Sequence, residues 1–179
     1  MKRALAAASG ALLLSVALTG CITVNVPAKP GPPAATNGPT NGSDDDDFAN
    51  AVTLPCNDGD IVVSDLTTPA IITGDCASVT IEGSNFDVRI EKAAGLTIRG
   101  DDNDVDVVEL GSVIINGQDN DVDVSQSGIR LVEIAGNDNS VSTPGDIDGA
   151  VVNGNDNDLE YAALGDRAEN GTGNSFGDD

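Results

Sequence analysis

Aspartates recur at two fixed positions of a repeated motif in the second half of the chain, and carboxylates at fixed spacing can bind calcium. The motif begins with glycine, and its copy at Gly100–Val105 reads GDDNDV. Calcium takes oxygen ligands of this kind from loops. A solvated acidic edge explains the same residues without a ligand, and this is the interpretation we favour. The candidate ligands, at the third and fifth positions of the motif, are Asp102, Asp104, Asp119, Asp121, Asp138, Asp156 and Asp158.

The motif returns at nearly constant intervals, which indicates a stacked repeat. A glycine opens each copy, and the intervals between these glycines are 17, 17, 19, 18 and 17 residues. A unit this short cannot bury a core alone, so each unit must pack on its neighbours and the domain must be a solenoid. The opening residues are Gly83, Gly100, Gly117, Gly136, Gly154 and Gly171.

Short alternations of apolar residues flank each motif and predict strands. Apolar residues lie four and two positions before the glycine, as in Val113 and Ile115, and a second alternation follows, as in Val105-Asp-Val107. A period of two with β-branched residues is typical of strands rather than helices. We therefore expect an all-β fold, a short-coil parallel β-helix (β-solenoid) of 17–19 residues per coil. About six or seven such coils make a rod roughly 30 Å long.

The fourth position of the motif is asparagine in every copy except the first, where Phe86 replaces it. Glycine, asparagine and aspartate tolerate positive φ, so the glycine and this asparagine suit a corner between two strands. In stacked coils, identical asparagines lie above one another and can exchange amide hydrogen bonds along the axis. We expect a structural ladder of Asn103, Asn120, Asn139, Asn157 and Asn174.

The N-terminus has the pattern of a secretory signal peptide. Met1-Lys-Arg3 is positively charged, Ala4–Leu18 is largely apolar, and Leu18-Thr-Gly-Cys21 follows directly. The apolar stretch is too short for a spanning helix. The segment resembles the lipobox of bacterial lipoproteins. This resemblance implies a diacylglycerol on the Cys21 thiol, cleavage before Cys21, and a fatty acid such as palmitate on the new amine. The alternative is an ordinary secretory signal in which the cysteine is coincidental.

Three cysteines would leave an odd thiol in an exported protein, which supports a separate role for Cys21. Cys56 and Cys76 then remain as a pair. We predict a disulfide between them at the N-terminal end of the solenoid, where the first coil lacks a neighbour. A metal site is the alternative, although two cysteines in a chain without histidine fall short of a zinc site.

Composition divides the chain into three parts. We assign residues 1–20 to the lipoprotein signal peptide, residues 21–50 to a lipidated, disordered tether, and residues 51–179 to the β-solenoid domain. Repeated proline and glycine keep such a tether extended, so it would lift the domain off the membrane. At the far end, Arg167 and Glu169 occupy positions that carry core residues in earlier coils. We expect this last coil to cap the stack or to fray.

The mature chain is strongly acidic. If it starts at Cys21 it loses Lys2 and Arg3, and six basic residues against 30 acidic ones give a formal net charge of −24. Phosphate backbones would be repelled, which argues against nucleic acid as a partner and leaves cationic partners.

One stretch of the chain resembles a known calcium-binding repeat. Asn153–Leu159 looks like the nonapeptide of calcium-binding β-rolls, in which glycine, asparagine, aspartate and an aliphatic residue recur. The double glycine of that repeat is missing, and in most copies the aspartate is directly followed by the aliphatic residue. Calcium is the one cofactor that this resemblance suggests.

Catalysis has little support in the sequence. The chain has no histidine, no nucleophile paired with a base, and only four aromatic residues on which a sugar could stack. We expect no enzyme activity, and a small polysaccharide-modifying enzyme that uses paired carboxylates is the third alternative.

The repeats, signal and tether together resemble the domain of unknown function 3060 family of exported bacterial proteins, many of them lipoproteins. The hallmark of that family is a recurring glycine, a small polar residue, paired asparagines and a valine before a short strand. The resemblance covers about residues 56–176, and aspartate usually replaces the first asparagine of the pair in this chain. It implies a β-solenoid fold and a surface location, and no established activity.

These observations predict a non-catalytic, lipid-anchored surface protein on the outer face of a bacterial cell membrane, acting as a structural or binding module of the cell envelope. Arg89, Asp106 and Asp123 are expected to form one outward row suited to an extended envelope polymer or a protein partner. The alternative is a calcium-dependent, β-roll-like adhesin or binding domain that uses the stacked Asp columns.

Overall fold

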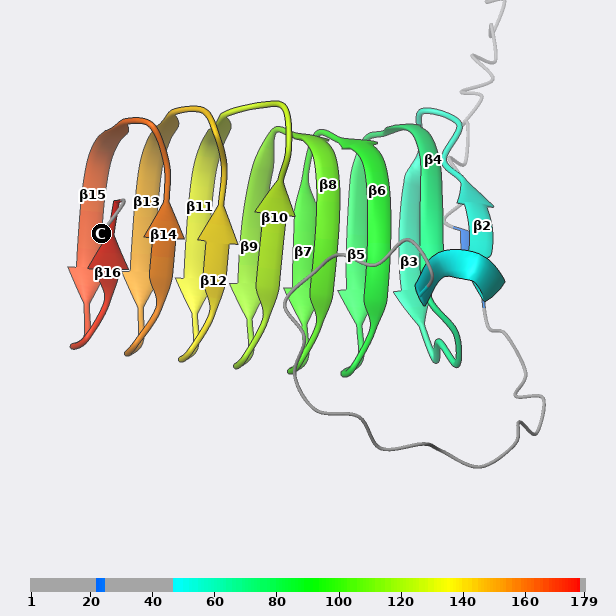
Figure 1. Ribbon diagram of the computed structural model, residues 1–179, viewed down its shortest axis with the longest axis horizontal. Coiled ribbons are helices and arrows are strands. Elements are labelled where there is room, and N and C mark those ends of the chain that lie inside the picture. The colour runs from blue at the N-terminus through cyan, green and yellow to red at the C-terminus, as the bar shows by residue number, and fades with distance from the viewer. Residues whose placement is uncertain (1–21, 25–46, 178–179) are drawn as a thin grey trace, which may run out of the picture.

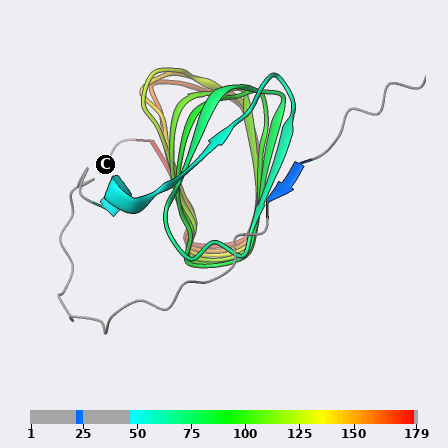
Figure 2. The same cartoon turned by 90° about the vertical axis from the view of Figure 1, so that its right-hand side faces the viewer.

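The computed structural model describes residues 22–24 and 47–177, and this part of the chain forms a parallel β-solenoid (Figure 1). Two eight-stranded parallel sheets face each other, and the chain passes from one to the other strand by strand. Seen along the stack, the coils nearly superimpose (Figure 2). The predicted all-β class and short-coil parallel β-helix are therefore confirmed.

Odd-numbered strands form one sheet and even-numbered strands form the other. Register partners in neighbouring coils are 17 to 19 residues apart, as expected from the glycine intervals. A 3-10 helix, η1 (Asp47–Asn50), precedes the first coil. Sheet A contains β1 (Ile22–Val24), β3 (Asp60–Ser64), β5 (Ser78–Glu82), β7 (Leu96–Arg99), β9 (Ser112–Asn116), β11 (Ile129–Ala135), β13 (Ile147–Asn153) and β15 (Leu164–Asn170). Sheet B contains β2 (Val52–Pro55), β4 (Ala70–Cys76), β6 (Asp87–Ala93), β8 (Asp104–Leu110), β10 (Asp121–Val124), β12 (Ser140–Ser142), β14 (Asp158–Glu160) and β16 (Ser175–Phe176).

The core lies between the two sheets and consists of columns of stacked aliphatic side chains. On sheet A, Ile98 and Ile115 are in register and fully buried, and on sheet B the same holds for Val105 and Val122. Burying each such side chain stabilises the fold by about 1.5–3 kcal/mol. Each column needs the coil above and the coil below to exclude water, which makes the stability a property of the whole stack.

The motif forms the turn from sheet A to sheet B, and its glycine is required by close approach of the coils. A Cβ on Gly117 would overlap the carbonyl oxygen of Gly100, and one on Gly136 would overlap that of Gly117. The left-handed conformation belongs mainly to the third position, where Asp102 and its counterparts have φ near 55°. The prediction that the fourth-position asparagine takes positive φ is wrong. Among the described residues, the non-glycine positions of the motif with positive φ are Asn85, Asp102, Asp119, Asp138 and Asp156.

The predicted disulfide is present. Cys56 follows β2 and Cys76 ends β4, so the bond joins the first two coils with a Cα–Cα distance of 5.2 Å. Both cysteines are buried in the core. The bond therefore ties β2, the terminal strand of sheet B, to the second coil.

The last coil closes the stack with polar side chains. Arg167 and Glu169 pair in register with the core residues Ala150 and Val152 of the preceding coil. The Arg167 guanidinium lies 3.9 Å from the ring centroid of Phe176, and its Nη2 is 2.7 Å from the Glu169 Oε2. These contacts cover the end of the core, as expected for a capping coil.

Two elements fall within residues 21–50, the range predicted to be a tether. Strand β1 pairs with β3 at one edge of sheet A, and η1 precedes β2. The signal peptide at residues 1–20, the predicted lipidation site Cys21, and residues 25–46 lie outside the described residues.

Candidate functional site

The outer face of sheet B carries two parallel rows of polar side chains, most of which are acidic or carry a hydroxyl group. Alternate residues of each strand point outward while Val88, Val105 and Val122 point into the core, and the parallel register stacks like positions in neighbouring coils. We call the two outward rows the acidic face. They comprise Asp87, Asp104, Asp121, Ser140, Asp158 and Ser175 in the first row, and Arg89, Asp106, Asp123, Ser142 and Glu160 in the second.

The expected outward row of Arg89, Asp106 and Asp123 is therefore confirmed in register. An Arg89 Nη2 lies 3.3 Å from Asp106 Oδ2, and the Arg89 guanidinium also lies 4.3 Å from the ring centroid of Phe48. Helix η1 thus packs on this face at its N-terminal end. Next to the ion pair runs an open groove lined by Arg89, Asp106, Val107, Val108, Asp123, Val124 and Ser125.

Burial and neighbouring charges raise the pKa of two aspartates on the acidic face, Asp104 and Asp123. Partial loss of hydration, followed by the charges of Asp121 and Asp106, raises the pKa of Asp104 from 3.8 to about 6. The pKa of Asp123 is raised by the same kinds of cause, with a hydrogen bond from Ser142 acting in the opposite direction. The face therefore has a strong negative potential at neutral pH and favours cationic groups.

The candidate calcium ligands divide between two places. The third-position residues Asp102, Asp119, Asp138 and Asp156 are exposed on the turn edge, where their backbone conformation explains them. Of the fifth-position residues, Asp104 and Asp121 are neighbours in register, whereas Asp158 lies between Ser140 and Ser175. Asp158 has a buried Oδ1 without a hydrogen-bond partner. Among residues 22–24 and 47–177, no group of three or more Asp, Glu, Cys or His side chains is arranged to hold a metal ion.

The asparagine ladder is confirmed. The Nδ2 of Asn103 donates to Oδ1 of Asn120 at 2.9 Å, and Asn120 repeats this toward Asn139 at 3.0 Å. Each Nδ2 also donates to the carbonyl of a motif glycine, as Asn120 does to Gly100 at 3.0 Å. The ladder continues through Asn157 to Asn174. Asn103, Asn120, Asn139 and Asn157 are buried and hydrogen-bonded inside the solenoid, which assigns the ladder a structural role.

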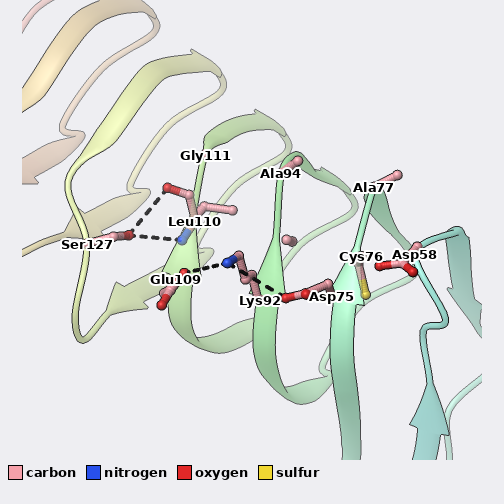
Figure 3. A pocket seen from close by; sticks show the side chains of 11 residues that line it. Asp58, Asp75, Cys76, Ala77, Lys92, Ala94, Glu109, Leu110, Gly111 and Ser127 are labelled. Atoms are coloured by element: carbon pink, nitrogen blue, oxygen red, sulfur yellow. Dashed lines mark hydrogen bonds and ion pairs between the residues drawn. The ribbon is translucent and has the colours of Figure 1, made fainter.

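A corner groove at the other end of the sheet B strands was missed by the sequence reasoning (Figure 3). Lys92 lies between two acids from neighbouring coils, with its Nζ 3.0 Å from Glu109 Oε2 and 3.7 Å from Asp75 Oδ1. These carboxylates, Glu109 above all, raise the pKa of Lys92. Beyond them, the Ser127 hydroxyl accepts a hydrogen bond from the Leu110 amide at 3.0 Å.

The repeat spacing contains the signal for these ion pairs. Asp75, Lys92 and Glu109 are each 17 residues apart, so they occupy one position of three successive coils. The same spacing separates Glu82 from Arg99, whose Nη1 lies 2.8 Å from the Glu82 Oε1. Basic residues of the coil at 83–99 thus pair with acids one coil away. The groove therefore contains a basic side chain that is paired with acids from both neighbouring coils.

Comparison with known proteins identifies one family. The sequence model of the family described as "Protein of unknown function (DUF3060)" matches residues 70–110, which confirms the predicted resemblance over β4 to β8. No curated protein and no solved structure matches the chain significantly. Within the described residues, none of the helices has the length and apolar character needed to cross a membrane.

Proposed function

We propose that this chain, which carries the repeat of the DUF3060 family, is a non-catalytic, lipid-anchored surface protein. It would serve as a structural or binding module of the cell envelope. The observation that carries the binding role is the acidic face, a flat array of stacked carboxylates along the solenoid. The anchor is supported by the sequence around Cys21. The protein would then lie on the outer face of the cell membrane, outside the cytoplasm.

The charge of the face selects the partner. Partial burial, followed by the charges of Asp121 and Asp106, raises the pKa of Asp104, and a cationic partner would offset the repulsion among these carboxylates. The rows repeat at the spacing between neighbouring strands, roughly 4.8 Å, so a partner with regularly spaced positive charges fits them best. A basic envelope polymer or the basic segment of a protein meets this requirement.

A charge-matched pair of variants tests whether a cationic partner binds to the acidic face. The face variant carries Asp104→Asn, Asp106→Asn, Asp121→Asn and Asp123→Asn. The control variant carries four changes at exposed aspartates elsewhere, Asp65→Asn, Asp146→Asn, Asp148→Asn and Asp166→Asn, and has the same net charge. Binding of the detergent-solubilised chain to immobilised poly-lysine would be measured at fixed ionic strength.

We expect the face variant to bind poly-lysine more weakly by roughly tenfold, because four exposed charge contacts contribute about 0.4 kcal/mol each. The control variant should lose far less affinity. Equal losses in the two variants would mean that net charge alone drives binding, and the acidic face would have no special role.

The alternative is a calcium-dependent adhesin or binding domain. The observation that favours it is the in-register pair Asp104 and Asp121, since a divalent ion between adjacent carboxylates would offset their repulsion. This alternative requires that calcium stabilise the protein at concentrations at which magnesium does not.

A further inference from the structure

Strand β1 belongs to sheet A but lies outside the repeated coils. Its three residues pair in parallel with β3, in the register Ile22 with Ile61, Thr23 with Val62 and Val24 with Val63. Without β1, strand β3 would be the terminal strand of sheet A and would present an open row of backbone donors and acceptors. Strand β1 therefore closes the N-terminal edge of the solenoid by strand addition.

Strand β1 begins one residue after Cys21. Cys21, the predicted lipidation site, is bonded directly to Ile22, and adjacent Cα atoms are about 3.8 Å apart. Residues 25–46 join β1 to η1, and these two elements lie on opposite sides of the N-terminal end of the stack (Figure 2). That segment thus connects two points on the solenoid, rather than the anchor to the domain.

We infer that β1 is an anchoring strand that holds the N-terminal coil directly at the lipid surface, an inference that depends on the proposed lipid anchor at Cys21. A free tether of residues 21–50 would let the domain stand up to roughly 100 Å from the membrane. With β1 paired to β3, the lipid is attached one residue from an edge strand of the solenoid. The first coil is held at the membrane, and the acidic face of later coils remains open to a partner.

Cross-linking of the full-length protein in membranes tests this pairing. Thr23→Cys and Val62→Cys place two thiols at register partners, and a short bis-maleimide joins them if β1 is docked. The native Cys56 and Cys76 are oxidised to a disulfide, and lipid would block Cys21. A site for a specific protease is placed within residues 25–46, so that after cleavage only the cross-link connects the lipidated fragment to the domain on a denaturing gel.

A matched control uses Thr23→Cys with Thr97→Cys. Thr97 lies on the same outward row of sheet A as Val62, but three strand spacings, roughly 14 Å, from Thr23. We expect the cleaved Thr23→Cys/Val62→Cys chain to keep its lipidated fragment, and the control and both single variants to lose it. Loss of the fragment from all variants would overturn the inference. Cross-linked dimers would also overturn it, because β1 would then pair with a second copy.

A separate readout distinguishes failure of the anchor itself. The protein should sediment with membranes, and Cys21→Ala should release it. If the unmodified chain is soluble, the proposed lipid anchor fails and the membrane part of the inference fails with it. The cross-link would then be repeated in the Cys21→Ala background, where it reports on closure of the edge by β1 alone.

Discussion

Replacing Asn120 with alanine should strongly destabilise the protein, because its side chain is buried and hydrogen-bonded in the ladder. Asn120 is 1% exposed, and its Oδ1 accepts hydrogen bonds from the backbone amide of Asn103 at 3.2 Å and from its Nδ2 at 2.9 Å. Its Nδ2 donates to Gly100 O, Gln118 O and Asn139 Oδ1, each at 3.0 Å. The substitution therefore removes five hydrogen-bonding contacts, with the two Nδ2 hydrogens shared among three acceptors, and leaves partners in three coils without a substitute.

The magnitude follows from these contacts. Each net hydrogen bond contributes about 1 kcal/mol, and a buried group left without a partner costs about 1–3 kcal/mol. Partial relaxation and the entry of water reduce the sum, so we expect a loss of about 3–5 kcal/mol in the free energy of unfolding. At roughly 2 kcal/mol per molar, the slope of a small protein in urea, this lowers the midpoint by about 2 M.

The assay is urea unfolding of the chain from Ile22 onward, followed by circular dichroism, with Asn155→Ala as the control. Asn155 also forms a ladder, accepting from Thr172 and donating to Asn137, but it is exposed to water. Its truncation should cost less than about 1 kcal/mol, because water replaces the lost partners. Equal effects of the two substitutions would refute the argument that burial makes the asparagine ladder important.

The remaining predictions concern charge, packing and metal. Because the pKa of Asp104 is about 6 in the folded protein against an ordinary 3.8, the folded state binds this proton more tightly, and the ionised form destabilises the fold above pH 6. The melting temperature should therefore rise as pH falls from 7.5 toward 4.5. Asp104→Asn should stabilise the protein by about 1 kcal/mol at pH 7.5, after allowance for solvent screening, and should flatten that pH dependence. A flat pH profile in the unmodified chain would contradict the raised pKa of Asp104. Asp158→Ser should stabilise by about 1 kcal/mol in urea unfolding, since it removes a buried carboxylate oxygen without a partner. Gly117→Ala should lower the melting temperature severely, because its Cβ would overlap the Gly100 carbonyl; an unchanged melting temperature would mean that the coils separate readily. If the calcium alternative is correct, millimolar calcium should raise the melting temperature well above magnesium at equal ionic strength, whereas equal melting temperatures exclude it.

The repetitive part of the fold could be predicted because one physical requirement is repeated in each coil. The glycine interval sets the coil length, and apolar residues at alternate positions before and after the glycine set the register of both sheets. The asparagine ladder follows from the same logic, since stacking places identical amides in reach of one another. The acidic face follows as well, because alternate residues of a strand must point away from the core.

The features that could not be predicted lie where the repeat gives no information. Strand β1 has only three residues beside a proline-rich segment, and its pairing depends on the free edge of β3, which the sequence does not reveal. Glycine, asparagine and aspartate all tolerate positive φ, so the sequence does not distinguish the third position of the motif from the fourth. Only the structure shows that Asp102 adopts positive φ, while Asn103 turns inward. The charge triad centred on Lys92 falls outside the motif, although its 17-residue spacing was available.

The most direct test of the proposed function is the chemical state of the mature N-terminus. Mass spectrometry of the protein extracted from membranes should find an N-terminal peptide that begins at Cys21 and carries a diacylglycerol on sulfur and a fatty acid on nitrogen. The Cys21→Ala variant should lose both the lipid and the membrane association. A mature chain that begins elsewhere without lipid, or a Cys21→Ala variant that stays in the membrane fraction, would contradict the account of a lipid-anchored envelope module.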